Sequence, residues 1–142
     1  MVKSPAPRRL FWLVLLLGAA LRLGGLGEKQ LWVDELIQAD HTAGGGMARV
    51  LRELRVDVAP CPLDYLVQHF SFRLLGRSEI AARLPAALAG ILAVALLYRL
   101  GLAWLGGPGA LTAALLLAGY TLHVQYAQEG RPYSSFLRLT LL

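Results

Sequence analysis

Charged residues are scarce in this sequence. Asp, Glu, Lys and Arg make up 16% of its 142 residues, whereas apolar residues make up 56%. A soluble domain usually carries about a quarter charged residues. The stretch 100–128 contains no Asp, Glu, Lys or Arg, and a soluble helical hairpin rarely leaves so much surface uncharged. The composition therefore excludes an ordinary soluble domain and predicts a protein that crosses a membrane.

The sequence also has little cysteine and no continuous basic stripe. Cys61 is the only cysteine, so no disulfide can form within the chain. The formal net charge is +5, but the arginines are scattered between apolar blocks. This pattern does not favour a nucleic-acid partner, and it is typical of loops held on the cytoplasmic side of a membrane. The three histidines show no metal-ligand spacing.

The apolar blocks predict an all-α integral membrane protein with three transmembrane helices and the start of a fourth. The expected spans are 10–26, 80–98 and 109–126, near the lengths that cross a bilayer. The first block would also fit a secretory signal peptide, because basic residues precede it and small residues lie near its end. We favour an uncleaved helix, since two further apolar segments follow.

The basic tail sets the expected orientation. Lys3, Arg8 and Arg9 precede the first span, which favours a cytoplasmic N-terminus in a multi-pass plasma membrane protein. The remaining segments then alternate between the two sides. They are a cytoplasmic tail (1–9), an extracytoplasmic segment (27–79), a cytoplasmic turn (99–108), an outer loop (127–134) and the start of a truncated fourth helix (135–142).

The long outer segment contains helical patterns of its own. Apolar residues recur at helical spacing over 47–54 and over 63–74, and Pro62 is well placed as the first residue of the second helix. Glycines at 44–46 and the prolines at 60 and 62 separate the helices. Amphipathic helices beside a span usually lie in the interface plane. We therefore expect short juxtamembrane helices resting on the outer leaflet.

Two groups of polar residues follow the first and third spans. Asp34 and Glu35 come directly after Trp32-Val33, whereas Glu129, Arg131 and Tyr133 come just beyond the third span. With the expected topology both groups lie at the outer face, where acids are costly unless they are paired or used. Taken by spacing alone, Asp34 fits better as the N-terminal cap of the next helix.

Four sequence pieces occur in this order: Leu31-Trp32-Val33-Asp34-Glu35, Pro62-Leu63-Asp64-Tyr65-Leu66, Gly76-Arg77-Ser78-Glu79 with Ala82-Arg83-Leu84-Pro85, and Tyr126-Ala127-Gln128-Glu129-Gly130-Arg131-Pro132-Tyr133-Ser134. Together they resemble the N-terminal third of a GT-C-fold glycosyltransferase. More closely, the chain is similar to the bacterial glycosyltransferase family 39 group. That group is related to dolichyl-phosphate-mannose–protein mannosyltransferases and to the lipid A aminoarabinose transferase. At the second piece the family often has two adjacent prolines before Leu-Tyr. Here Cys61 takes the place of the first proline, and Asp64 takes the place of the tyrosine.

The resemblance implies a reaction and its partners. Enzymes of this kind move a sugar from a polyprenyl-phosphate carrier to an acceptor at the outer membrane face, so the implied partners are a lipid-linked sugar donor and membrane lipids. The displacement at the anomeric carbon needs a carboxylate to take the acceptor's proton. It also needs positive charge, from an arginine or a divalent metal ion, to stabilise the phosphate leaving group.

The resemblance also assigns roles to the polar residues. The catalytic candidates are Asp34, Glu35 and Glu129: Asp34 is the expected base, and Glu35 orients the acceptor or caps its helix. Glu129 resembles the second-loop acid, which holds the acceptor or serves as a ligand of a divalent metal ion. Arg131 is expected either to bind the carrier phosphate or to form a structural salt bridge. Tyr133 is a substrate-binding candidate and otherwise an interfacial anchor.

Two other classes of protein stay open at this point. A small non-catalytic scaffold or subunit predicts that Asp34 and Glu129 are separate and individually paired. A piece of a transporter would place its acids near the bilayer midplane, whereas both acidic groups here lie at helix ends. Members of the family that this chain resembles are several times longer than a membrane core of three helices. We therefore expect the 142-residue chain to insert in membranes without transferring sugar alone.

Overall fold

A computed structural model describes residues 8–56 and 61–130. All regular elements in these residues are helices, which confirms the expected all-α class. The tail residues 1–7 and the expected fourth span at 135–142 lie outside the described part. The helices are α1 (Arg8–Leu23), α2 (Val33–Ala43), α3 (Met47–Val56), α4 (Pro62–Leu75), α5 (Glu79–Trp104), α6 (Gly106–Gly119) and α7 (Thr121–Ala127).

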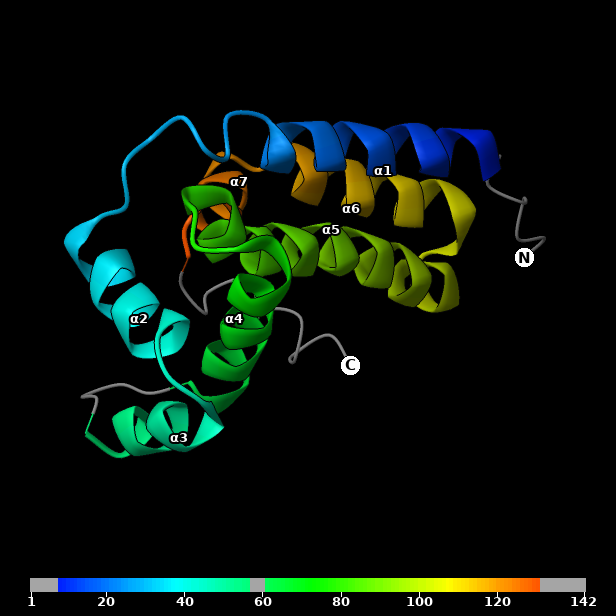
Figure 1. Cartoon of the computed structure of the whole chain (residues 1–142). Helices are drawn as coiled ribbons and strands as arrows, with labels where there is room; N and C mark the ends of the chain where they lie inside the picture. Colours follow the sequence, from blue (N-terminus) through cyan, green and yellow to red (C-terminus); the bar gives the residue numbers. More distant parts are fainter. Residues whose placement is uncertain (1–7, 57–60, 131–142) are drawn as a thin grey trace.

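Three helices form an elongated bundle. Helices α1, α5 and α6 lie side by side, and α5 packs against both of the others (Figure 1). Helix α4 leaves the start of α5 at a steep angle, and α2 and α3 pack on α4 away from the bundle (Figure 1). Helix α7 lies beside the first turns of α5, close to where α1 ends. One end of the bundle therefore gathers segments from the beginning, middle and end of the described chain.

The lengths of the bundle helices bear on how many cross a membrane. Within the described residues, α5 is the single helix that is long and apolar enough to do so alone. Helices α6 and α7 reach that length only together, and they bend by 60° at their junction. Helix α1 has 16 residues, about 24 Å at the rise of an α-helix. The described residues thus contain one clear span candidate, or two if α6 and α7 form one bent span, and the total of three spans stays a prediction.

Helix α5 begins earlier and ends later than the sequence predicted. The Ser78 hydroxyl accepts a hydrogen bond from the Ala81 N–H at 3.2 Å and caps the helix. Pro85 within α5 cannot donate to the Ala81 carbonyl, and Ser71 of α4 donates to that carbonyl instead, at 2.6 Å. The Ala82 carbonyl likewise accepts from Gln68 at 3.1 Å. The proline thus helps to dock α4 on α5.

The turn expected at 99–108 is shorter in the structure, and its cytoplasmic location stays a prediction. Helix α5 continues to Trp104, and α6 begins at Gly106, so Leu105 alone separates them. The reversal is made by Gly106, whose φ of 73° suits a residue without a Cβ. Pro108 then lies in the first turn of α6, where its missing N–H has no partner to lose. The Gly-Pro sequence therefore starts a helix here.

Small residues let α5 and α6 approach closely. Ala110, Ala114 and Ala118 recur every four residues on α6 and are fully buried, in one cluster with Val94 of α5. A Cβ placed on Gly101 would come within 2.8 Å of the Ala110 Cα. Such small residues at helix interfaces allow backbones to pack together in membrane proteins. This stripe of alanines is the contact face of α6.

The span expected at 109–126 is not one continuous helix. It is divided at Tyr120 into α6 and α7, and the buried Arg22 of α1 lies at the division. Its guanidinium donates to the Ala118 and Leu117 carbonyls, both at 3.0 Å, and contacts His123 Nδ1 at 2.8 Å. The last carbonyls of a helix need partners from outside the helix. Arg22 supplies them, which allows α6 to end inside the protein.

The helices expected to begin at Met47 and at Pro62 are both present. A buried polar layer joins α2 to α4: Gln38 donates to the Asp64 carboxylate at 2.6 Å, and Thr42 donates to Gln68 Oε1 at 2.7 Å. Hydrogen-bonded layers of this kind fix the register of two packed helices. The side chains of α2 that point away from α4, such as Leu36, are exposed. Their contact with the outer leaflet stays a prediction.

Candidate active site

A buried ion pair lies where α2 meets the beginning of α5. Glu35 on the first turn of α2 is 1% exposed, and Arg83 on α5 is 3% exposed. The pair is bidentate, with Arg83 Nη2 at 2.7 Å from Glu35 Oε2 and Nε at 3.0 Å from Oε1. Two parallel hydrogen bonds of this kind are among the strongest side-chain contacts. The pair therefore fixes α2 against α5.

The Arg83 guanidinium has no donor left over. Its remaining N–H groups donate to the carbonyls of Leu26 at 3.2 Å, Lys29 at 2.8 Å and Gln30 at 3.0 Å. With the two bonds to Glu35, all five donors of an arginine are used. Arg83 thus folds the segment between α1 and α2 around itself and sets the positions of residues 26–30.

Glu35 accepts two further hydrogen bonds, both from backbone. The N–H of Trp32 donates to Oε2 at 3.0 Å, and the N–H of Gly130 donates to Oε1. The first bond caps α2 with the carboxylate of Glu35, in the manner of one half of a capping box. The second bond ties the chain just after α7 to the start of α2. Glu35 therefore joins three segments of the site end.

These contacts determine the ionisation of Glu35. Burial raises the pKa of its carboxyl, but the hydrogen bonds from Arg83, Gly130 and Trp32, with the charge of Arg83, lower it by more. The pKa of Glu35 in the folded chain consequently lies below the ordinary value of a glutamate. Glu35 is ionised at neutral pH and is held in place by its partners.

The lowered pKa of Glu35 predicts a loss of stability in acid. Its contribution is complete above the unfolded-state pKa, about 4.3, and disappears as the pH falls through the lower folded-state value. One proton limits the slope to about 1.4 kcal/mol per pH unit. We expect the free energy of unfolding in detergent micelles, followed by circular dichroism, to fall below about pH 4.3. In Glu35→Gln this part of the slope should be absent, and an unchanged slope would contradict the assignment.

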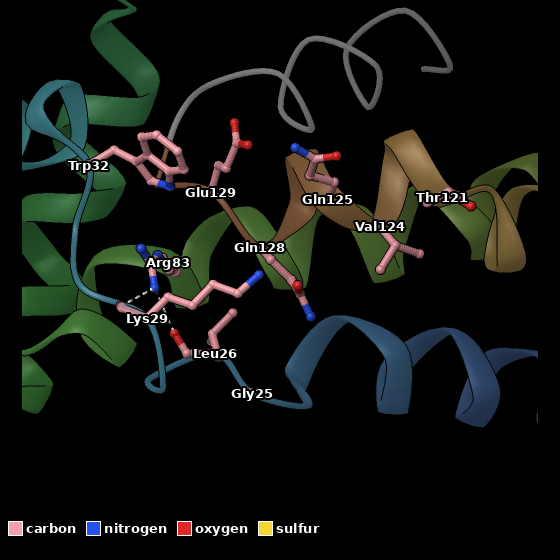
Figure 2. Close-up of a pocket in the computed structure, with 10 residues that line it drawn as sticks. All are labelled: Gly25, Leu26, Lys29, Trp32, Arg83, Thr121, Val124, Gln125, Gln128 and Glu129. Carbon is pink, nitrogen blue, oxygen red and sulfur yellow. Dashed lines mark hydrogen bonds between the residues drawn. The ribbon is translucent and has the colours of Figure 1, made fainter.

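A cavity of about 310 Å³ lies beside this ion pair. Its wall comes from the segment after α1, from Arg83 of α5, and from α7 with the residues that follow it (Figure 2). The charged residues of the wall are Lys29, Arg83 and Glu129, and the indole of Trp32 lies over one side. Gln128 closes another side, and its amide donates to the Leu21 and Gly24 carbonyls at 2.9 Å. The backbone at and just after the end of α1 thus holds the residue that follows α7.

Only some of the expected site residues lie at the cavity. Glu129 lines the cavity and is half-buried. Asp34 is exposed on the first turn of α2, two residues beyond Trp32, and does not line this cavity. Glu35 lies behind the cavity wall in its pair with Arg83. Arg131 and Tyr133 lie outside the described residues, so the expected meeting of Asp34, Glu129 and Arg131 stays a prediction.

The described residues give a metal ion few ligands. They contain no group of three His, Cys, Asp or Glu side chains placed to hold one. Glu129 offers one carboxylate at the cavity, whereas a divalent cation usually takes several oxygen ligands. A divalent metal ion with Glu129 as one ligand therefore stays a prediction.

Sequence reasoning gave no role to Arg83 or Lys29, although both line the cavity. Arg83 lies 48 positions from Glu35, so no local spacing links the two. One signal was present: an arginine inside an apolar block that reads as a span, which is expensive in lipid unless it is paired. Lys29 offered no comparable signal, because a lysine in a loop is ordinary.

Comparison with known proteins supports the resemblance noted in the sequence. No curated protein and no solved structure matches this chain. The sequence pattern of one family does match, over residues 58–142, which is more than half of the chain. The matched part includes Arg83 and Glu129, whereas Asp34 and Glu35 precede it. The chain belongs to the dolichyl-phosphate-mannose-protein mannosyltransferase family.

Proposed function

We propose that this chain forms the N-terminal part of a membrane glycosyltransferase. It moves a sugar from a polyprenyl-phosphate carrier to an acceptor at the outer face of the membrane, with its N-terminal tail in the cytoplasm. Family membership supports glycosyl transfer as the general role, and the long apolar helix α5 supports a membrane location. The identity of the carrier and the side of transfer are parts of the proposal.

The observation that carries the proposal is the position of the cavity. Segments that are about 100 residues apart, the one after α1 and the one after α7, meet at one end of the bundle and enclose it (Figure 2). Its wall combines a carboxylate from Glu129, an ammonium group from Lys29 and the indole of Trp32. A sugar phosphate on a lipid tail needs such a polar site at a membrane surface, since its tail stays among lipids and its head stays in water.

The proposed reaction is a displacement at the anomeric carbon. The acceptor oxygen forms a bond to this carbon as the bond from the carbon to the phosphate oxygen breaks, and the phosphate leaves with the electron pair. A carboxylate takes the acceptor's proton. Asp34 is the proposed base and Glu129 holds the donor or the acceptor in the cavity, while Arg131 is a proposed phosphate ligand. Glu35 acts through position alone, because its oxygens are engaged by Arg83 and two N–H groups.

Transfer in native membranes tests this function. Membranes from cells that carry the natural gene are compared with membranes from cells that lack it, with radiolabelled mannose, glucose, galactose or aminoarabinose on polyprenyl phosphate as donor. We expect at least one of these labels to move to an acceptor in the first membranes only. Equal transfer of every label in both would overturn the proposal.

The side of the membrane is tested on the same protein. A reporter inserted near Gly45, between α2 and α3, should be extracytoplasmic, since α2 to α4 lie at the cavity end of the bundle (Figure 1). A cytoplasmic signal at Gly45 would place the cavity on the inner face and would refute transfer at the outer face.

A further inference from the structure

The charges of the cavity wall differ in what they can still bind. Three charged residues line it: Lys29, Arg83 and Glu129. The charge of Arg83 is compensated by Glu35, and its five donors are all engaged. An incoming anion could be bound by Arg83 only if one of these buried bonds broke. Lys29 therefore supplies the available positive charge among the described residues of the wall.

The backbone of Lys29 is fixed while its side chain is not. Its carbonyl accepts from Arg83 at 2.8 Å, and the neighbouring carbonyl of Gln30 accepts from the same guanidinium at 3.0 Å. The ammonium group makes no hydrogen bond or ion pair with the described residues. Figure 2 shows the side chain extending through the cavity toward α7. A held backbone with an uncommitted ammonium group suits a ligand with negative charge, for which lysine acts as a compact point charge.

An apolar groove adjoins the polar cavity. The groove is lined by the apolar side chains of Leu23, Leu26, Ile80 and Leu84, by two glycines and by Glu28, at the end of α1 and the start of α5. The cavity and the groove share Gly25 and Leu26. A ligand that lies in both must carry an anionic head and an apolar tail. This juxtaposition distinguishes a lipid phosphate from a free phosphate ion, which would gain nothing from the groove.

We infer that Lys29 binds the phosphate of a polyprenyl-phosphate ligand whose first isoprenoid units lie in the groove beside Ile80 and Leu84. The inference rests on the proposed function and gives its donor a binding site in this chain. Charge-assisted hydrogen bonds from the ammonium group would hold the phosphate, and Glu129 across the cavity would face the sugar. Lys29 acts by binding, and it takes no proton in the reaction.

Equilibrium binding tests the inference without requiring turnover. The purified 142-residue chain is placed in nanodiscs of phosphatidylcholine and titrated with a radiolabelled short-chain polyprenyl phosphate. We expect Lys29→Gln to raise the Kd at least about tenfold, the value of one charge-assisted hydrogen bond. Lys29→Arg should bind nearly as well as the wild type. Arg73→Gln removes the same charge from an exposed position on α4 that does not line the cavity, and it should leave the Kd unchanged.

The tail contact is tested separately. Ile80→Gln should weaken binding of the polyprenyl phosphate, because the groove then loses apolar surface. Inorganic phosphate should compete poorly with the labelled lipid. Competition by inorganic phosphate at the same concentration as by unlabelled polyprenyl phosphate would assign the site to a free ion and overturn the inference.

The outcomes separate this inference from the proposed function. If the wild type and Lys29→Gln bind polyprenyl phosphate equally, the role of Lys29 is overturned, while gene-dependent sugar transfer in native membranes would still support glycosyl transfer. If transfer in native membranes is absent, the proposed function fails whatever Lys29 binds. Circular dichroism of each variant shows whether its helices are intact.

Discussion

Replacing Arg83 by methionine is expected to lower the free energy of unfolding by about 3–5 kcal/mol, the usual cost of breaking a buried ion pair from one side. The carboxylate of Glu35 would stay buried without its partner, and the carbonyls of Leu26, Lys29 and Gln30 would lose their donors. Unfolding in detergent micelles, followed by circular dichroism, measures the effect. The result would show that the site end of the bundle depends on one guanidinium.

A second arginine gives a matched control. Arg77 also donates to a carboxylate, that of Asp40 at 3.0 Å, but the two side chains are 58% and 61% exposed. Exposed pairs usually contribute about 0–1 kcal/mol, so Arg77→Met should cost little. An Arg83→Met variant that loses no more than Arg77→Met would show that the Glu35–Arg83 pair is not buried as described.

A double variant separates the buried charge from the loss of packing. In Arg83→Met with Glu35→Met, no charge is left unpaired, and buried ion pairs replaced by apolar residues are often tolerated. We expect the double variant to recover part of the lost stability. It should not recover all of it, because the three loop carbonyls would still lack their donors. The N–H groups of Trp32 and Gly130 would in addition lose the carboxylate that accepts from them.

Asp34→Asn is expected to reduce sugar transfer by at least about a hundredfold, the usual contribution of a positioned base, and Glu129→Gln to reduce kcat/KM by about tenfold or more, the value of one charge-assisted hydrogen bond to the substrate. Both changes keep the shape of the side chain and remove its charge. The expectation for Glu129 rests on its place in the cavity wall, whereas that for Asp34 rests on the family resemblance. The variants are made in the natural gene product, and kcat and KM are measured in isolated membranes with the labelled donor.

Glu79→Gln is the control for removing a carboxylate. Glu79 is exposed at the first residue of α5 and does not line the cavity, so transfer should stay near the wild-type rate. Near-normal turnover with Asp34→Asn would reduce Asp34 to an acidic residue of a first helical turn. Near-normal turnover with Glu129→Gln would show that sugar transfer does not depend on the carboxylate in this cavity.

Local patterns predicted the parts of the fold that depend on local chemistry. The apolar blocks located the long helix α5 and the general course of α1 and α6, because apolar length is visible in any window of the sequence. Pro62 marked the first residue of α4, since a proline loses no hydrogen bond there. The family was also recognised from four short pieces, and the match over 58–142 confirms it.

The predictions that were wrong concern features that no local sequence pattern determines. The division between α6 and α7 at Tyr120 has no strong local cause, and it is stabilised by Arg22 from a segment 96 positions earlier. The predicted end of the second span at Tyr98, just before Arg99, was too early, because α5 continues through Arg99 to Trp104. The sequence motifs identified Glu129 as a site candidate and Trp32 as part of a family motif. Only the fold shows that both residues line one cavity with Lys29.

Arg22 also affects how the protein is assembled during synthesis. The Leu117 and Ala118 carbonyls and the His123 ring, which its guanidinium contacts, are made about a hundred residues later. At about 5–20 residues per second, ribosomes need roughly 5–20 s to reach them. During that interval the guanidinium must be solvated by water, lipid head groups or the insertion machinery. The first helix therefore enters its final surroundings only after the later helices have arrived, which makes docking of α6 and α7 the step that completes the bundle.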